Sequence, residues 1–171
     1  PPTKLNYRIL EILVTTNASL EGVKALLNLK HSKNQRIYYS DLISRAIKGE
    51  HTELLSYLVK HRLFINFLYD RWSFNSNSII NKAIESGNVE IFKIIFNALP
   101  KDSVQNSALE SAIQEGKVKI IKFLIQKKYD PKDIRTSNLV SVLARSKTME
   151  TYFLINKHFP LKPHYANLLH E

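Results

Sequence analysis

The stretch SALESAIQEGKVKIIKFLIQKK, residues 107–128, decides the fold of this chain. Its first part has apolar residues one, three and four positions apart, which share one face of a helix: Ala108, Leu109, Ala112 and Ile113. Its second part, residues 118–125, has the wide apolar side of a second helix. Gly116 stands between them, where glycine can end the first helix in a left-handed conformation. Because such a hairpin cannot bury both apolar faces alone, the stretch predicts neighbouring units of the same kind.

Copies of this stretch recur along the chain. At a spacing of 29 residues, Ala83 takes the place of Ala112. Gly87 takes the place of Gly116 at the same spacing, and Ala46 precedes Ala83 by 37 residues. The predicted repeats span approximately residues 5–30, 39–62, 77–99, 106–129 and 137–159, with a partial sixth at 163–171.

Helix breakers follow the same period. Pro100, Pro131 and Pro160 each come just after a second helix, which a proline cannot continue. Periodic apolar residues alone fit any helical bundle, but periodic breakers in addition indicate tandem helical repeats. In the second repeat, we expect Ser40 or Asp41 to cap the first helix.

Two of these copies resemble the middle of an ankyrin repeat. They read AIESGNVEI at residues 83–91 and AIQEGKVKIIKFLI at residues 112–125. His51 keeps the histidine that follows the family's glycine, although the glycine slot itself holds Glu50. The spacings of 29 to 37 residues bracket the family's repeat of about 33. No copy has the family's Thr-Pro-Leu-His opening.

The resemblance implies an all-α fold, a helical-repeat solenoid of about five helix–turn–helix repeats plus a partial sixth. It implies one ankyrin-like domain over residues 1–171. Since the opening motif is missing, we expect degenerate repeats joined by loops, some without strand pairing. We expect residues 163–171 to pack against the fifth repeat.

The composition is that of a folded protein without cysteine chemistry. The 171 residues are 44% hydrophobic and include no cysteine, which excludes disulfides, cysteine metal sites and a thiol nucleophile. This composition fits an intracellular protein of the cytoplasm or nucleus. No apolar run approaches the roughly 18 residues of a membrane span. Because the chain starts with Pro1 and Pro2, we expect it to be a fragment.

The net charge of +10 is spread along the chain, and residues 76–105 are neutral. The densest basic patch comprises Lys117, Lys119, Lys122, Lys127, Lys128, Lys132 and Arg135. The simpler interpretation of this patch is a solvent-exposed helix face that keeps the protein soluble. The more specific hypothesis is that the patch attracts an acidic partner. Nucleic acid or anionic lipid is a further alternative partner.

An aromatic insertion at residues 63–76 explains why one spacing is 37 residues. Insertions between repeats often form loops on the binding face, and Trp, Tyr and Arg often anchor interfaces. The hypothesis is a partner-binding hot spot formed by Tyr69, Arg71, Trp72 and Phe74. The alternative is that these rings cover the core beneath the loop. Phe64 and Phe67 are assigned to the core.

No motif for catalysis or cofactor binding occurs in the sequence. Four scattered glycines form no phosphate-binding loop, and no serine lies in a Gly-x-Ser-x-Gly turn. His158, His164 and His170 are six residues apart and do not share a helix face, so no metal site is expected. We therefore expect a protein that is not an enzyme and has no cofactor.

The expected function is protein–protein interaction through the concave face and the inter-repeat loops. The positions beside the Ala-Ile pairs should face outward. The candidate partner-binding residues there are Arg45, Lys48, Lys82, Glu85 and Gln114, with Ser111 beside them and Arg145 in the fifth repeat. The expected molecule is a monomer that binds another protein. The alternatives are the nucleic-acid or lipid surface above and a scaffolding segment of a larger multidomain protein.

Overall fold

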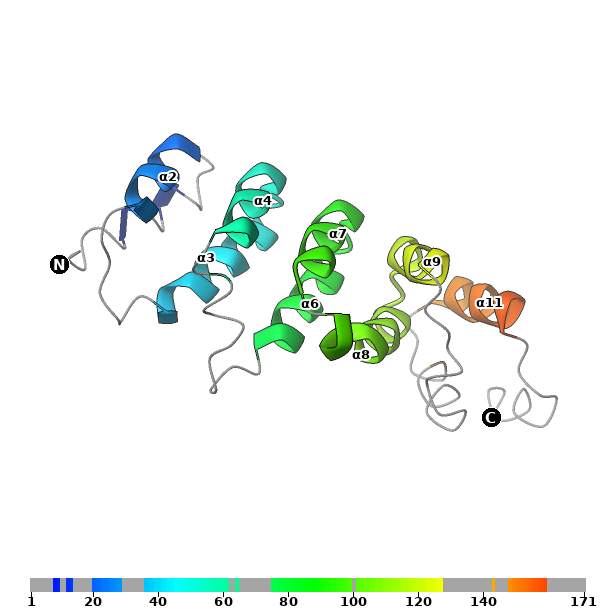
Figure 1. Cartoon of the computed structure of the whole chain (residues 1–171). Helices are drawn as coiled ribbons and strands as arrows, with labels where there is room; N and C mark the ends of the chain where they lie inside the picture. Colours follow the sequence, from blue (N-terminus) through cyan, green and yellow to red (C-terminus); the bar gives the residue numbers. More distant parts are fainter. Residues whose placement is uncertain are drawn as a thin grey trace. The chain divides into compact units, whose positions relative to one another are not determined.

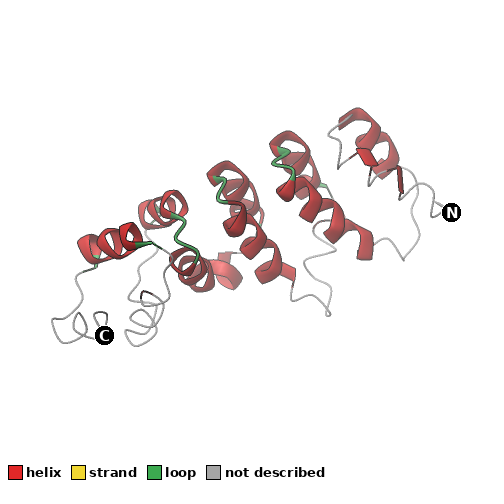
Figure 2. Ribbon diagram, turned by 180° about the vertical axis from the view of Figure 1, so that it is seen from behind, coloured by secondary structure: helices red, strands yellow, loops and turns green. Residues whose placement is uncertain are grey.

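The computed structural model describes residues 8–9, 12–13, 20–28, 36–61, 64, 75–99, 101–127, 143 and 148–159. These residues form helices and the turns between them, and no strand occurs among them (Figure 2). The helices of Figure 1 are α2 (Leu20–Asn28), α3 (Arg36–Lys48), α4 (Thr52–Lys60), α6 (Asn75–Ser86), α7 (Val89–Ala98), α8 (Lys101–Gln114), α9 (Val118–Gln126) and α11 (Met149–His158). The chain forms two compact units, Pro1–Leu99 and Pro100–Glu171.

Helices in the first unit pack as a stack of pairs (Figure 1). Within each pair, α3 contacts α4 and α6 contacts α7. Between the pairs, α3 contacts α6 and α4 contacts α7, so first helices stack on first helices and second on second. In the second unit, α8 contacts α9, and α9 contacts α11. The predicted all-α helical-repeat fold is confirmed.

In the three repeats whose first helices the structure describes, the core occupies the same positions, as the periodicity predicts. The buried positions of the first helices are Leu42, Ile43, Ala46 and Ile47 in α3, Ile79, Ile80, Ala83 and Ile84 in α6, and Ala108, Leu109, Ala112 and Ile113 in α8. Each buried Leu or Ile side chain contributes about 1.5–3 kcal/mol relative to an exposed one. The alanines keep the space between neighbouring helices small. Phe64 is also buried, as expected, whereas Phe67 lies outside the described residues.

The turn after each first helix confirms the predicted glycine slot. Gly87 and Gly116 have φ angles of 72° and 64°, in the left-handed region. Glu50 occupies the same slot in the second repeat and has a φ of 56°. The Glu50 N–H donates to the carbonyl of Ile47 at 3.1 Å, and the next N–H donates to the carbonyl of Ala46 at 2.9 Å. This is a Schellman motif, in which a left-handed residue ends the helix.

Gly49, next to this slot, has a different role. A Cβ atom on Gly49 would overlap the imidazole ring of His51. The glycine therefore leaves room for the histidine ring, and it is Glu50 that adopts the left-handed backbone. For a residue with a Cβ, that conformation costs roughly 1–2 kcal/mol.

The first helices begin earlier than the sequence pattern predicts. Helix α3 starts at Arg36, so Ser40 and Asp41 lie inside the helix and neither caps it. The extra turn is held by Tyr39, which is buried and bonded to the second helix of the same repeat. Helix α8 likewise starts at Lys101, directly after Pro100.

The register of α11 also differs from the prediction by one residue. Its buried residues Thr151 and Ile155 correspond to Ile120 and Leu124 of α9, a spacing of 31 residues. The sequence pattern predicts a spacing of 30, at which residues 153–155 (FLI) fall on residues 123–125 (FLI). The reason is that a threonine takes an apolar position. Its hydroxyl pairs with the Thr148 hydroxyl at 2.7 Å, which satisfies it inside the core.

Candidate functional site

The candidate site in the first unit is a row of polar residues beside the buried Ala-Ile pairs, named here the first-helix surface: Arg45 and Lys48 on α3, and Lys82 and Glu85 on α6. Lys48, Lys82 and Glu85 are exposed, and Arg45 is half-buried. The Lys82 Nζ donates to the Ser44 hydroxyl of the preceding repeat at 2.7 Å. This bond ties α6 to α3 at the surface and fixes the position of one lysine in the row.

The other predicted partner-binding residues are placed differently. Gln114 and Ser111 lie half-buried on α8 in the second unit. The remaining ones, Tyr69, Arg71, Trp72, Phe74 and Arg145, lie outside the described residues. Their assignment to a binding surface stays a prediction.

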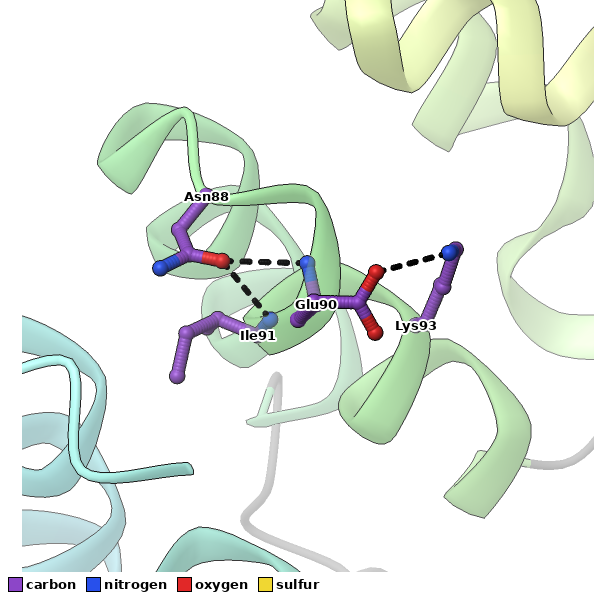
Figure 3. A network of polar contacts seen from close by, with 4 residues as sticks. All are labelled: Asn88, Glu90, Ile91 and Lys93. Atoms are coloured by element: carbon purple, nitrogen blue, oxygen red, sulfur yellow. Dashed lines mark hydrogen bonds and ion pairs between the residues drawn. The ribbon is translucent and has the colours of Figure 1, made fainter.

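A second polar contact joins the second and third repeats at their turns. The Asn88 side chain caps α7, because its Oδ1 accepts from the N–H groups of Glu90 at 3.0 Å and Ile91 at 3.3 Å (Figure 3). Its Nδ2 donates to a carboxylate oxygen of Glu50 at 2.9 Å. In the first turn of α7, Lys93 pairs with Glu90 at 2.8 Å (Figure 3). The asparagine thus caps its own helix and holds the strained turn of the neighbouring repeat.

Tyr39 makes a buried polar contact in the first unit. Only 2% of its surface is exposed, and its hydroxyl donates to the Leu58 carbonyl at 2.5 Å, joining α3 to α4. Burial raises the pKa of Tyr39 above the range of ordinary titration, and the nearby Tyr57 adds to the effect. The ring of His61 lies 6.2 Å from that of Tyr39, centroid to centroid.

The rings of Tyr39, Tyr57 and His61 form an aromatic cluster, and the ring of Tyr57 connects this cluster to α2. The Lys24 Nζ lies 5.8 Å from the centroid of that ring, at cation–π distance. Lys24 also pairs with Glu21, one turn earlier on α2, at 2.6 Å. The aromatic cluster therefore links α2, α3 and α4, and the Lys24 ammonium group lies over the ring of Tyr57.

Sequence reasoning missed two of these residues. Tyr39 continues the apolar phase of α3, since it stands three, four, seven and eight positions before Leu42, Ile43, Ala46 and Ile47. That phase would have identified it as a core residue. Asn88 directly precedes an apolar run, which is the position of a helix cap.

The described residues hold no group of three or more His, Cys, Asp or Glu side chains that could ligate a metal ion. No helix in the described part of the chain is long and apolar enough to cross a membrane. The side chains of the first-helix surface carry ammonium, guanidinium and carboxylate groups. What they can offer a partner is charge-assisted hydrogen bonding.

Comparison with known proteins gives one match. The family model for ankyrin repeats, in three copies, matches residues 45–135. No curated protein and no solved structure matches the chain. The matched region begins in α3 and includes α4, α6, α7, α8 and α9.

Proposed function

Because the chain belongs to the ankyrin repeat family, whose repeats are generally protein–protein interaction modules, we propose that it is a non-enzymatic module that binds a partner protein through its first-helix surface. The observation that carries the proposal is the row of exposed charges on α3 and α6. The buried Ala-Ile pairs beneath the row hold its residues on a rigid, regularly spaced support. A rigid support lowers the entropy lost on binding.

The charge pattern of the surface suggests the kind of contact. Lys48 and Lys82 are exposed cations, and Glu85 places a carboxylate on the same helix as Lys82. A partner that fits would carry carboxylates opposite the lysines and a cation opposite Glu85. Such complementarity favours specificity and a fast association rate. We further propose that Gln114, Arg145 and the aromatic insertion extend the contact, in a monomer that acts inside the cell.

The proposal is tested by capturing partners on the whole chain and comparing variants. The charge-reversed variant combines Lys48→Glu, Lys82→Glu and Glu85→Lys. The matched control combines Glu53→Lys and Lys60→Glu, which are exposed on the second helix α4. A specific partner should lose at least tenfold in affinity for the first variant and bind the control like wild type. Equal binding to all three proteins would refute the first-helix surface as the site.

A second candidate function, binding of nucleic acid, rests on the net charge of +10. Affinity for a 20-nucleotide single strand would then fall steeply between 50 and 200 mM salt, because counterions released from the phosphates drive such binding. A protein partner bound through a few ion pairs would show a shallower dependence. The slope of affinity against salt concentration separates the two functions.

A further inference from the structure

Two large apolar side chains lie exposed on α11. Met149 and Phe153 keep 64% and 63% of their surface exposed, and they are four residues apart, on one side of the helix. The core of α11 is supplied by other residues, Thr151 and Ile155. Both side chains therefore lie mostly outside the core that α11 forms, although the Phe153 ring meets the Tyr152 ring edge-on at 5.6 Å between centroids.

The equivalent position in other repeats is polar. In the register fixed by the buried residues, Phe153 corresponds to Lys122 of α9, Lys93 of α7 and Ser56 of α4. An aromatic ring thus replaces a solvated side chain on the outward side of a second helix. Phenylalanine and methionine are enriched at protein interfaces relative to the rest of a protein surface.

Exposed basic side chains lie on α11 and on its neighbour α9. Helix α9 contacts α11, and the Lys122 Nζ lies 4.0 Å from a carboxylate oxygen of Glu150, between Met149 and Phe153 in sequence. Lys119 lies one turn before Lys122 and is exposed, and Lys157 is exposed one turn after Phe153. We call these six residues the α9–α11 surface. Three cations and one anion give it an excess of positive charge.

We propose that the α9–α11 surface docks a short acidic segment of another protein, whose apolar side chains cover Met149 and Phe153 and whose carboxylates face Lys119, Lys122 and Lys157. The excess positive charge selects an acidic segment over a basic one. The pair favours a peptide over a nucleic acid, because Met149 offers a base no planar ring to stack on and the carboxylate of Glu150, between the two side chains in sequence, repels phosphates. The flexible thioether of Met149 adapts to different apolar side chains.

This surface is separate from the first-helix surface and uses none of its residues. The two proposals can therefore fail independently. Loss of a partner on reversing the charges of α3 and α6 says nothing about α11. Variants of α11 in turn leave α3 and α6 unchanged.

The test selects peptides from a phage-displayed library of random 16-residue sequences on the immobilised full chain. We expect enrichment of peptides that combine Asp or Glu with large apolar residues. An enriched peptide, labelled with fluorescein, is then titrated with the full chain by fluorescence anisotropy. Met149→Gln with Phe153→Gln should weaken its binding at least tenfold, and Lys119→Glu with Lys157→Glu at least fivefold. The control Lys60→Glu, an exposed lysine on α4, should leave it unchanged.

Several results would overturn the proposal. These are the absence of any enrichment, enriched peptides without acidic residues, and binding that survives the Met149→Gln and Phe153→Gln changes. A concentration-dependent dimer in sedimentation velocity, abolished by those two changes, would mean that a second copy covers the surface. Binding of a labelled 20-nucleotide strand that depends on the lysines, whether or not it also depends on Phe153, would mean a nucleic-acid surface, since bases can stack on an aromatic ring. Circular dichroism confirms that each variant is folded.

Discussion

Replacing Tyr39 with phenylalanine should show how much the Tyr39 hydrogen bond contributes to the free energy of unfolding and how the contribution of this residue depends on pH. The Tyr39 hydroxyl is buried and donates to the Leu58 carbonyl. That carbonyl also accepts from the N–H of His61 at 3.1 Å, so the substitution leaves no acceptor unpaired. A net hydrogen bond of this kind contributes about 1 kcal/mol. At pH 7 the free energy of unfolding of Tyr39→Phe should therefore be about 1 kcal/mol below that of wild type.

The sign of this difference reverses at high pH. Burial, the main cause, raises the pKa of Tyr39 in the folded state, whereas in the unfolded chain the phenol titrates at its ordinary value of about 10. The stability that Tyr39 contributes is complete below that value. It is lost as pH rises, because only the unfolded state releases the proton. The stability lost by wild type reaches about 1.4 kcal/mol at pH 11. Near pH 10.6 this loss equals the roughly 1 kcal/mol that the hydrogen bond contributes, so the two proteins should be equally stable there.

Urea unfolding followed by circular dichroism at 222 nm, repeated at intervals from pH 7 to pH 11.5, measures this directly. The comparison with Tyr39→Phe cancels the contributions of all other ionisable groups, because these groups are common to both proteins. Parallel stability curves, with no crossing up to pH 11.5, would refute the reasoning. They would mean that the Tyr39 hydroxyl reaches water and ionises in the folded state.

Three further changes test the turns and the core by the same urea unfolding measurement. Gly116→Ala should lower the free energy of unfolding by about 1–2 kcal/mol, because its φ of 64° disfavours a Cβ, and an unchanged midpoint would contradict the helix-ending role. Asn88→Ala should cost about 1 kcal/mol through loss of the α7 cap, and Asn88→Ser, which keeps a capping oxygen without adding a negative charge beside Glu50, should recover part of it. Ile84→Ala, at a fully buried position of α6, should cost about 2–5 kcal/mol, whereas the exposed Glu85→Ala should change stability by less than about 0.5 kcal/mol.

The sequence predicts the repeated core well because that core depends on local periodicity. The Ala-Ile pairs, the apolar second helices and the left-handed slot at Gly87 and Gly116 all lie where the pattern places them. These features are decided within about 20 residues, by the helical period and by the conformational freedom of glycine. The first-helix charges also follow from the same register, since they flank the pairs.

What the sequence does not predict depends on contacts between distant residues. The early start of α3 rests on Tyr39, which bonds a carbonyl 19 residues later. The shifted register of α11 rests on Thr151, a polar residue that is buried because another hydroxyl pairs with it. Neither partner can be identified from hydrophobicity alone. A polar side chain in an apolar position is ambiguous until its hydrogen-bond partner is known.

Glu50 shows how stacking compensates for a poor local sequence. Its left-handed backbone is unfavourable for a residue with a Cβ by roughly 1–2 kcal/mol. Its side chain, however, accepts a hydrogen bond from Asn88 of the next repeat at 2.9 Å, a contact that glycine cannot make. The strain in one turn is thus partly offset by a bond that forms only when the two repeats are stacked. In this turn, stability depends on the neighbouring repeat, which is the behaviour expected of a protein whose units cannot fold alone.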